Sequence, residues 1–199
     1  MHNTKRKVRK RTRNSALKYA AYVLQQRNQT PTKGKGMRYK LRHLEPSDGR
    51  ALFEFYFTGL SKTDRKFFGQ PYPLFLQPLK TVKELRQRIK KWQLENDWYF
   101  FLLYAGEKIV GCSMLKRCST SRPVTGIAIH KKYRRQGLGM ILQRVIINAA
   151  RNIGLKRIWA AAHDDNIASL RMHTKCGYKT TGKVMLKQSH REIEMKMEL

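Results

Sequence analysis

Acidic residues are scarce in this sequence, and its first 44 residues contain none. The chain has 13 Asp and Glu residues against 43 Lys and Arg residues, so its formal net charge at pH 7 is +30. Residues 1–44 carry fourteen of these cations, and the first carboxylate is Glu45. A charge this far from zero determines partners rather than fold. It favours polyanionic partners such as nucleic acid, the ribosome, an acidic membrane surface or an anionic cofactor.

Cysteine and long apolar runs are scarce as well. Three cysteines without a ligand spacing exclude a disulfide framework, predict a reducing compartment and give no sign of a metal site. No apolar run approaches the roughly 20 residues that a membrane-spanning helix needs, and the N-terminus lacks the apolar stretch of a secretory signal. We therefore expect a cytoplasmic protein without a membrane span. Import into an organelle through the basic N-terminus is the alternative.

The remaining composition predicts one folded domain with a basic extension. A chain of 199 residues can bury a real core, and nine Tyr, eight Phe and three Trp argue against a disordered chain. We expect residues 1–36 to form a basic, largely flexible arm with a short helix, and residues 37–199 to form the domain. The arm could neutralise phosphates of RNA or the ribosome, act as a transit peptide, or be a solvated tail without a specific partner.

Hydrophobic periodicity predicts a mixed α/β domain. The pattern reads β-α-α-α-β-β-β-α-β-α-β-β, with a hairpin that turns at residues 105–108 and one parallel crossover around a helix at 138–152. The first helix, over residues 45–60, is expected to bury Leu52, Phe53 and Tyr56. The helix at 81–96 begins with a capping-box spacing and has a basic surface outside its apolar stripe.

The segment YRRQGLGMILQRVI (133–146) places two glycines between a predicted strand and the start of the 138–152 helix. Backbone N–H groups at a helix start lack intrahelical partners and lie at the positive end of the helix dipole. Glycines let a ligand approach the backbone closely. The segment therefore suits a phosphate or pyrophosphate, although it matches neither the Walker A loop nor the G-x-G-x-x-G fingerprint.

The spacing Arg134-x-x-Gly137-x-Gly139 resembles the acetyl-CoA-binding motif [RQ]-x-x-G-x-[GA] of the GCN5-related N-acetyltransferase (GNAT) superfamily. The segment DDNIASLRMHTKCGYK (164–179) is similar to the second signature of that family, and YKLRHLEPSDGRALFEFY (39–56) is similar to its usual first strand and helix. The resemblance covers residues 37–199 and leaves the basic arm unexplained.

The resemblance implies a central mixed sheet of about seven strands, flanked by helices and with splayed central parallel strands. It implies acetyl-CoA as co-substrate, no metal, and a monomer or homodimer. Backbone amides of the glycine loop would bind the pyrophosphate, and strand 123–130 would pair with the pantetheine. The cofactor-binding residues implied are Ile127, Ala128, Ile129, Arg134, Arg135, Gln136, Gly137, Leu138, Gly139, Met140, Asn166 and Ser169.

The family mechanism is direct attack of a neutral amine on the thioester inside a ternary complex. It requires a base, an acid for the thiolate and an oxyanion donor, here a backbone N–H near Ile129. The acid is often a Tyr, and His173 occupies that position. The central strand lacks the Glu that many relatives use as base. His130 and His163 are the candidates for the base, and carboxylates that could act through water are Glu54, Glu84, Glu192 and Glu194.

The positive charge narrows the choice of acceptor. It disfavours polycationic small molecules, because the whole protein repels them at long range. An amine of a protein or of an RNA-associated substrate fits better, including a ribosomal protein or a protein N-terminus at the ribosome. Two alternatives are an enzyme that resembles the toxins that acetylate aminoacyl-tRNA, and a non-catalytic protein of this fold that binds RNA or the ribosome.

Overall fold

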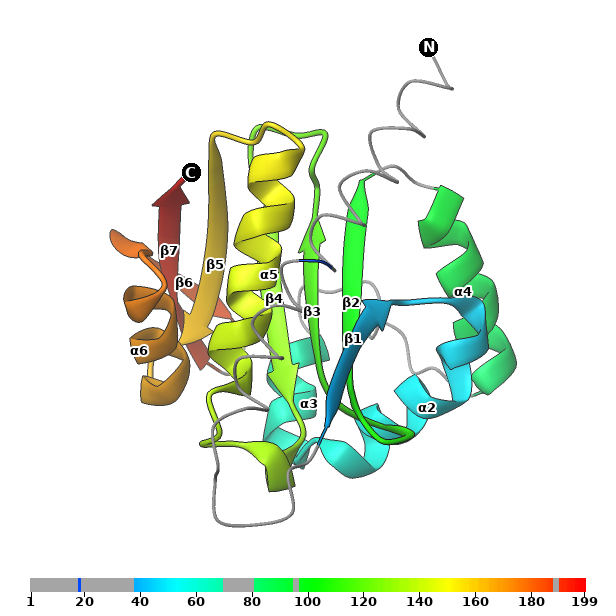
Figure 1. Ribbon diagram of the computed structural model, residues 1–199. Coiled ribbons are helices and arrows are strands. Elements are labelled where there is room, and N and C mark those ends of the chain that lie inside the picture. Colours follow the sequence, from blue (N-terminus) through cyan, green and yellow to red (C-terminus); the bar gives the residue numbers. More distant parts are fainter. Residues whose placement is uncertain (1–17, 19–37, 70–80, 95–96, 188–189) are drawn as a thin grey trace.

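The computed structural model shows a single mixed sheet with helices on both faces (Figure 1). It describes Lys18 and residues 38–69, 81–94, 97–187 and 190–199, so the expected arm over residues 1–36 lies almost entirely outside the described residues. The predicted mixed α/β class and seven-stranded sheet are confirmed. None of the described helices is long and apolar enough to cross a membrane.

Seven strands make up the sheet. They are β1 (Tyr39–His43), β2 (Trp98–Ala105), β3 (Lys108–Lys116), β4 (Val124–Ile129), β5 (Arg157–His163), β6 (Lys179–Lys187) and β7 (His190–Glu198). Their spatial order is β1-β2-β3-β4-β5-β7-β6, and β4–β5 is the parallel pair among antiparallel neighbours. The last strand of the chain is therefore inserted between β5 and β6.

The helices flank this sheet. They are α2 (Gly49–Glu54), α3 (Lys62–Gly69), α4 (Val82–Leu94), α5 (Leu138–Asn152) and α6 (Ile167–Lys175), joined by the 3₁₀ turns η1 (Pro46–Asp48) and η3 (Lys131–Tyr133) and the π-helical turn η2 (Phe55–Gly59). Helix α5 is the crossover between β4 and β5, with the bounds that the sequence predicts. In Figure 1, α5 and α6 lie in front of the sheet, while α3 lies behind it.

Strand β2 shows how one sheet supports two cores. Phe100, Leu102 and Tyr104 face the cluster that contains α2 and α4, whereas Phe101 and Leu103 face the α5 side. Side chains alternate between the two faces of a strand, and both faces are covered here. The strand therefore reads as a continuous apolar run in the sequence.

Strands β4 and β5 separate almost as soon as they pair. Their one registered pair is Val124 with Trp159, and the Trp159 N–H donates to the Pro123 carbonyl at 2.9 Å. The Thr125 hydroxyl donates to the Trp159 carbonyl at 3.3 Å and contacts the Tyr178 hydroxyl at 3.2 Å. Beyond this point β4 keeps β3 on one edge only. The splayed parallel strands expected from the resemblance are thus present.

The first helix differs from its expected form. Its last turn is π-helical, over Phe55–Gly59, and an i→i+5 turn rotates the following side chains away from the 3.6-residue period. Leu52 is buried as expected, but Phe55 is the buried aromatic residue, while Phe53 and Tyr56 are only partly buried against the same cluster.

A buried polar network joins β1, η1 and β2. The Asp48 carboxylate accepts hydrogen bonds from the Arg42 guanidinium, from the Tyr104 hydroxyl at 2.9 Å and from the Glu45 N–H at 2.8 Å. Asp48 is 2% exposed. Burial, together with the hydrogen bond to Asp48 and its charge, raises the pKa of Tyr104 to about 12.

We expect Asp48→Ala to destabilise the domain. The substitution leaves the buried Tyr104 hydroxyl and the Glu45 N–H without their acceptor, so the free energy of unfolding should fall by about 2–3 kcal/mol. Urea denaturation measures the change, and Tyr104→Phe, which removes the bond to Asp48 and the bond from Arg42 at 3.0 Å, should cost about 1–2 kcal/mol. A loss of less than about 0.5 kcal/mol for Asp48→Ala, as at an ordinary surface site, would contradict this role.

Candidate active site

The loop before α5 leaves backbone N–H groups open to a ligand. Arg135 has φ +60° and Gly137 has φ +73°, both in the left-handed region. Gly137 is the N-cap of α5, and no side chain caps the helix there. The amides of Leu138, Gly139 and Met140 therefore begin the helix without intrahelical acceptors, at the positive end of its dipole. This is the geometry of an anion site.

Gly139 brings this loop close to α6. A Cβ atom built at Gly139 would lie 3.1 Å from the Met172 sulfur and 3.9 Å from Cγ1 of Ile129. A larger side chain would push against both neighbours. The two glycines of the motif therefore have different physical roles, since Gly137 supplies the left-handed turn and Gly139 supplies the close approach.

A cavity of about 780 Å³ opens where β4 and β5 diverge. Its wall includes most of the site residues expected from the sequence, namely Ile127, Ala128, Ile129, Arg134, Arg135, Gly137, Leu138, Gly139, Met140, His163, Asn166, Ser169 and His173. The described lining does not include Gln136, whose side chain accepts a hydrogen bond from the Tyr39 hydroxyl at 2.9 Å. Residues 37 positions apart in the chain, such as His163 and Gly126, thus share one wall.

The free edge of β4 directs main-chain groups into this cavity. The His130 N–H donates to the Val110 carbonyl of β3 at 2.9 Å, whereas the Pro123 carbonyl faces β5. Backbone direction alternates along a strand, so the N–H and C=O groups of Ile127 and Ile129 point to the β5 side. No strand of the described chain pairs with them there, although the Ile129 carbonyl accepts a hydrogen bond from Arg134 Nε. The two N–H groups and the Ile127 carbonyl are available to amide groups of a ligand.

Helix α6 forms another part of the cavity lining. Asn166 is its N-cap, and its side-chain oxygen accepts the Ser169 N–H at 3.1 Å. Arg171 and Lys175 also line the cavity. They lie one helical turn apart and add positive charge near the loop. Arg171 was missed in the sequence, although its i, i+4 spacing to Lys175 after a helix cap could have indicated it.

Arg134 links the glycine loop to α3. Its guanidinium forms an ion pair with Asp64, and its Nε donates to the Ile129 carbonyl at 3.3 Å. Burial alone would raise the pKa of Asp64, but hydrogen bonds from Ser61 and Arg134 and the Arg134 charge outweigh it and lower the pKa. The pair spans 70 positions in the chain. It fixes the motif arginine between the end of β4 and the helix on the opposite wall.

His173 is buried and oriented by its own helix. Its Nδ1 donates to the Ser169 carbonyl at 2.9 Å, its Nε2 is buried with no hydrogen-bond partner among the described residues, and its ring lies edge-on to Tyr178 at 5.1 Å. Burial lowers the pKa of His173, against a smaller opposing effect of the Ser169 hydrogen bond. At neutral pH the ring is neutral, with its proton on Nδ1 and a lone pair on Nε2.

The lowered pKa of His173 predicts a loss of stability in mild acid. Between its native pKa and the usual value of about 6.5, the unfolded chain binds more protons than the native chain. The stabilisation is complete above about pH 6.5 and declines as the pH falls below it. The unfolding free energy, measured by urea titration from pH 7.5 to 5, should fall less steeply in His173→Leu. An unchanged slope would contradict this.

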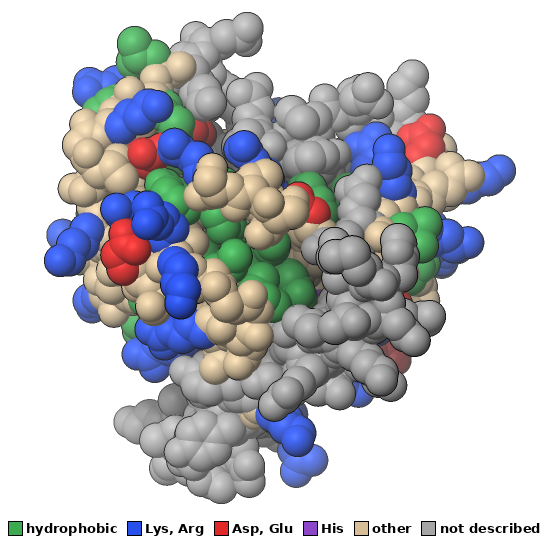
Figure 2. Space-filling model, turned by 90° about the horizontal axis from the view of Figure 1, so that it is seen from above, with side chains coloured by type: hydrophobic (Ala, Val, Ile, Leu, Met, Phe, Trp, Pro, Cys, Tyr) green, Lys and Arg blue, Asp and Glu red, His purple; other side chains and the backbone are tan. Residues whose placement is uncertain are grey.

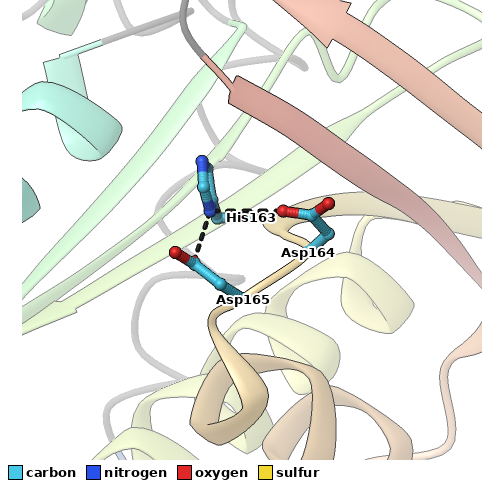
Figure 3. A group of neighbouring side chains, drawn as sticks. All are labelled: His163, Asp164 and Asp165. Carbon is cyan, nitrogen blue, oxygen red and sulfur yellow. Dashed lines mark hydrogen bonds and ion pairs between the residues drawn. The ribbon is translucent and has the colours of Figure 1, made fainter.

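His163 and Asp165 form a hydrogen-bonded pair at the end of β5 (Figure 3). The Asp165 carboxylate accepts from Nδ1 of His163, and the Asp164 carboxylate lies 3.5 Å from the same nitrogen. A proton on Nδ1 makes Nε2 the basic nitrogen of the neutral ring. The three side chains offer ligand atoms within 4.8 Å of one another. They come from consecutive residues, however, and the imidazole nitrogen already has a carboxylate partner.

His130 lies apart from the described lining of the cavity. Its Nδ1 accepts the Lys132 N–H at 3.2 Å, and a Cβ atom at Gly59 would come within 2.6 Å of its ring. Burial lowers its pKa, as do the charges of nearby cations, led by Lys131 and Lys132. The ring caps η3 and packs on η2, which is an arrangement for packing rather than for proton transfer into the cavity.

Three carboxylates line the cavity. Glu192 of β7 lies directly across from His163 and lines the cavity, where Asp64 and Asp165 also contribute. Glu194 lies two pairs further on, is bound by Arg122 and accepts from the Thr181 hydroxyl at 3.0 Å. Among the carboxylates proposed from the sequence, Glu192 is the one in the described lining.

The diverging parallel strands, the uncapped glycine loop and the cavity between them are the arrangement of a transferase that binds an acyl-CoA. Comparison with known families agrees with this. The model of the acetyltransferase (GNAT) family matches residues 65–178, more than half of the sequence. The chain belongs to this family, and acetyl-CoA is its co-substrate.

Solved structures share the fold at low sequence identity. The ribosomal-protein-S5-alanine acetyltransferase of Vibrio fischeri is 16% identical with a TM-score of 0.67, covering 84% of this chain and 97% of its own. A putative acetyltransferase of Salmonella typhimurium with bound acetyl-CoA is 17% identical with a TM-score of 0.63, covering 81% and 94%. A spermidine N-acetyltransferase mutant of Vibrio cholerae is 16% identical with a TM-score of 0.64, covering 80% and 94%.

Curated protein sequences gave no significant match. The acceptors that these structures are named for include both a protein and a polyamine, so the shared fold leaves the acceptor of this chain open.

Proposed function

We propose that this acetyltransferase transfers the acetyl group of acetyl-CoA to a primary amine of a protein or of an RNA-associated substrate, by direct attack in a ternary complex. The observation that carries the proposal is the mixed lining of the cavity. It combines amides and cations of the glycine loop and α6 with carboxylates and with His163. The amides and cations suit the phosphates of the donor, and the carboxylates suit an ammonium group.

The carboxylates of the cavity explain how a strongly basic protein can bind an amine. The net charge of +30 disfavours free polycations at long range, but Asp165 and Glu192 place negative charge at the cavity, where the charge of Asp64 is paired with Arg134. A single amine on a larger, anionic carrier suits both charges. The net positive charge of the protein attracts the carrier, and the carboxylates of the cavity attract the amine. An amine on a ribosomal protein or on an aminoacyl-tRNA is such a group, and the ribosomal-protein acetyltransferase of similar fold supports the first of these.

The proposed mechanism assigns each step to a group in the cavity. Acetyl-CoA supplies the thioester. His163, oriented by Asp165, takes the proton of the attacking ammonium on Nε2, and the Ile129 N–H on the free edge of β4 donates to the oxyanion. His173 is neutral and carries its proton on the nitrogen that faces Ser169. The thiolate is therefore protonated by water rather than by His173.

The donor half of the proposal is tested by titrating acetyl-CoA into the protein by calorimetry. Gly137→Glu places a carboxylate and a Cβ atom in the anion site, so we expect binding to weaken by at least about a hundredfold, or roughly 2.7 kcal/mol. Wild-type protein that fails to bind acetyl-CoA would overturn the assignment of the loop.

Gly154→Glu is the matched control for this experiment. Gly154 follows the other end of α5, has φ +80° and has open space around its Cβ position. A Glu at this position therefore imposes a backbone strain similar to that of Gly137→Glu without touching the cavity. It should bind acetyl-CoA like the wild type. Equal weakening in both variants would show that strain, and not the anion site, causes the loss.

The base is tested with His163→Gln. Removal of a general base should lower kcat by about 10²-fold, with little effect on the KM for acetyl-CoA. The assay uses the amine-bearing peptide that the wild type acetylates fastest among peptides from ribosomal protein N-termini, with an aminoacyl-tRNA as a second acceptor. Glu192→Gln is the comparison, and if it shows the larger kcat loss, Glu192 is the base.

A further inference from the structure

Helix α4 has a buried apolar stripe and a strongly basic outer face. Leu85, Ile89 and Trp92 are at most 7% exposed and pack in the core on the α2 side of the sheet. The other positions carry five cations and one acid, Glu84. The cations are Lys83, Arg86, Arg88, Lys90 and Lys91. This is a dense concentration of charge on a helix of 13 residues.

The spacing of these cations concentrates charge along the solvent side. Lys83, Lys90 and Lys91 are exposed, and all three lie opposite the buried stripe at 3.6 residues per turn. Arg86 and Lys90 are an i, i+4 pair of like charge, which costs an isolated helix about 0.2–0.5 kcal/mol. The arrangement therefore disfavours the helix by itself, and a polyanion on this face would offset the repulsion.

Burial of the apolar stripe selects among the polyanions. A helix that binds a lipid surface must insert its apolar face between the lipids. In α4 that face is already covered by the core, so what remains available is the outer face, which carries the cations and, at its C-terminal end, the exposed Leu94. The outer face has no aromatic side chain on which a base could stack. Phosphates of a nucleic-acid backbone fit this chemistry, because they need cations but neither insertion nor base recognition.

The position of α4 separates this face from the cavity. Helix α4 packs on α2 and η1, and its residues are absent from the described lining of the cavity. In Figure 1 it lies at the opposite end of the sheet from α6. Figure 2 shows Lys and Arg side chains over much of the surface seen from above, with few Asp or Glu among them. A nucleic acid bound at α4 would leave the catalytic cavity open.

We propose that the outer face of α4 binds the phosphate backbone of RNA and holds an RNA-associated acceptor at the enzyme. The inference rests on the proposed function for the nature of the acceptor. The helix is about 20 Å long, which spans three successive phosphates of an extended strand. Contacts to phosphate alone bind RNA without sequence preference and depend strongly on salt.

The test uses the full chain and a 20-nucleotide uridine RNA, with affinity measured by fluorescence anisotropy from 50 to 300 mM KCl. The variant is Lys83→Gln/Lys90→Gln/Lys91→Gln, which keeps good helix formers on the surface. Loss of three phosphate contacts should flatten the slope of log K against log salt by about 2 and weaken binding roughly a hundredfold at 0.1 M salt. An unchanged slope would overturn the proposal.

The matched control removes three exposed cations elsewhere. Lys156→Gln/Lys179→Gln/Lys183→Gln changes the net charge by the same amount on β6 and the loop before β5. Its RNA affinity should stay within about threefold of the wild type. An equal loss in both variants would show that net charge, and not α4, binds the RNA. Stronger binding of the wild type to phosphatidylserine vesicles than to RNA would also overturn the proposal.

The acetyl-CoA titration separates this inference from the proposed function. Both lysine variants should bind acetyl-CoA like the wild type, since neither touches the cavity. If the wild type fails to bind acetyl-CoA while the α4 variant shows the flatter salt slope, the assignment of the donor site is wrong and the RNA-binding face is supported. If the wild type binds acetyl-CoA and the salt slope of the α4 variant is unchanged, only the RNA-binding face is wrong.

Discussion

The divergence of β4 from β5 is the constraint on which the rest of this structure depends. A parallel pair normally continues along both strands, but here the ladder stops after Val124 and Trp159. The Thr125 hydroxyl, bonded to the Trp159 carbonyl and next to Tyr178, marks the last contact between them. Main-chain groups of the separated strands that lacked hydrogen-bond partners would be costly in a closed core. The space between the strands therefore stays open as a cavity that a ligand can fill.

The mixed lining of this cavity follows from the elements that surround it. The start of α5 and helix α6 bring amides and cations to the cavity, while β5, β7 and α3 bring His163 and carboxylates. The Arg134–Asp64 ion pair joins the glycine loop to α3. The proposed direct transfer requires donor and acceptor groups at fixed positions relative to each other, and the elements around one cavity provide such a frame.

Much of the fold could be predicted because local patterns and tertiary packing agree. Helix α5 and the β2–β3 hairpin have strong periodicity and glycine signals at their ends, and both form as expected. The helix after β1 departs from its period at Phe55, because a π-helical turn there depends on packing that no local pattern records. The arm and the domain boundary at residue 37 stay predictions.

By itself, the sequence determined the donor. The spacing of Arg134, Gly137 and Gly139 before an amphipathic helix dictates an anion-binding turn, because backbone geometry and helix dipole are local properties. The side chains proposed to receive the acceptor amine were brought together by the tertiary structure. Asp64, His163 and Glu192 are far apart in the chain, and only the insertion of β7 beside β5 and the packing of α3 on β4 bring them together. Contacts of that kind depend on the whole fold and have no local signature.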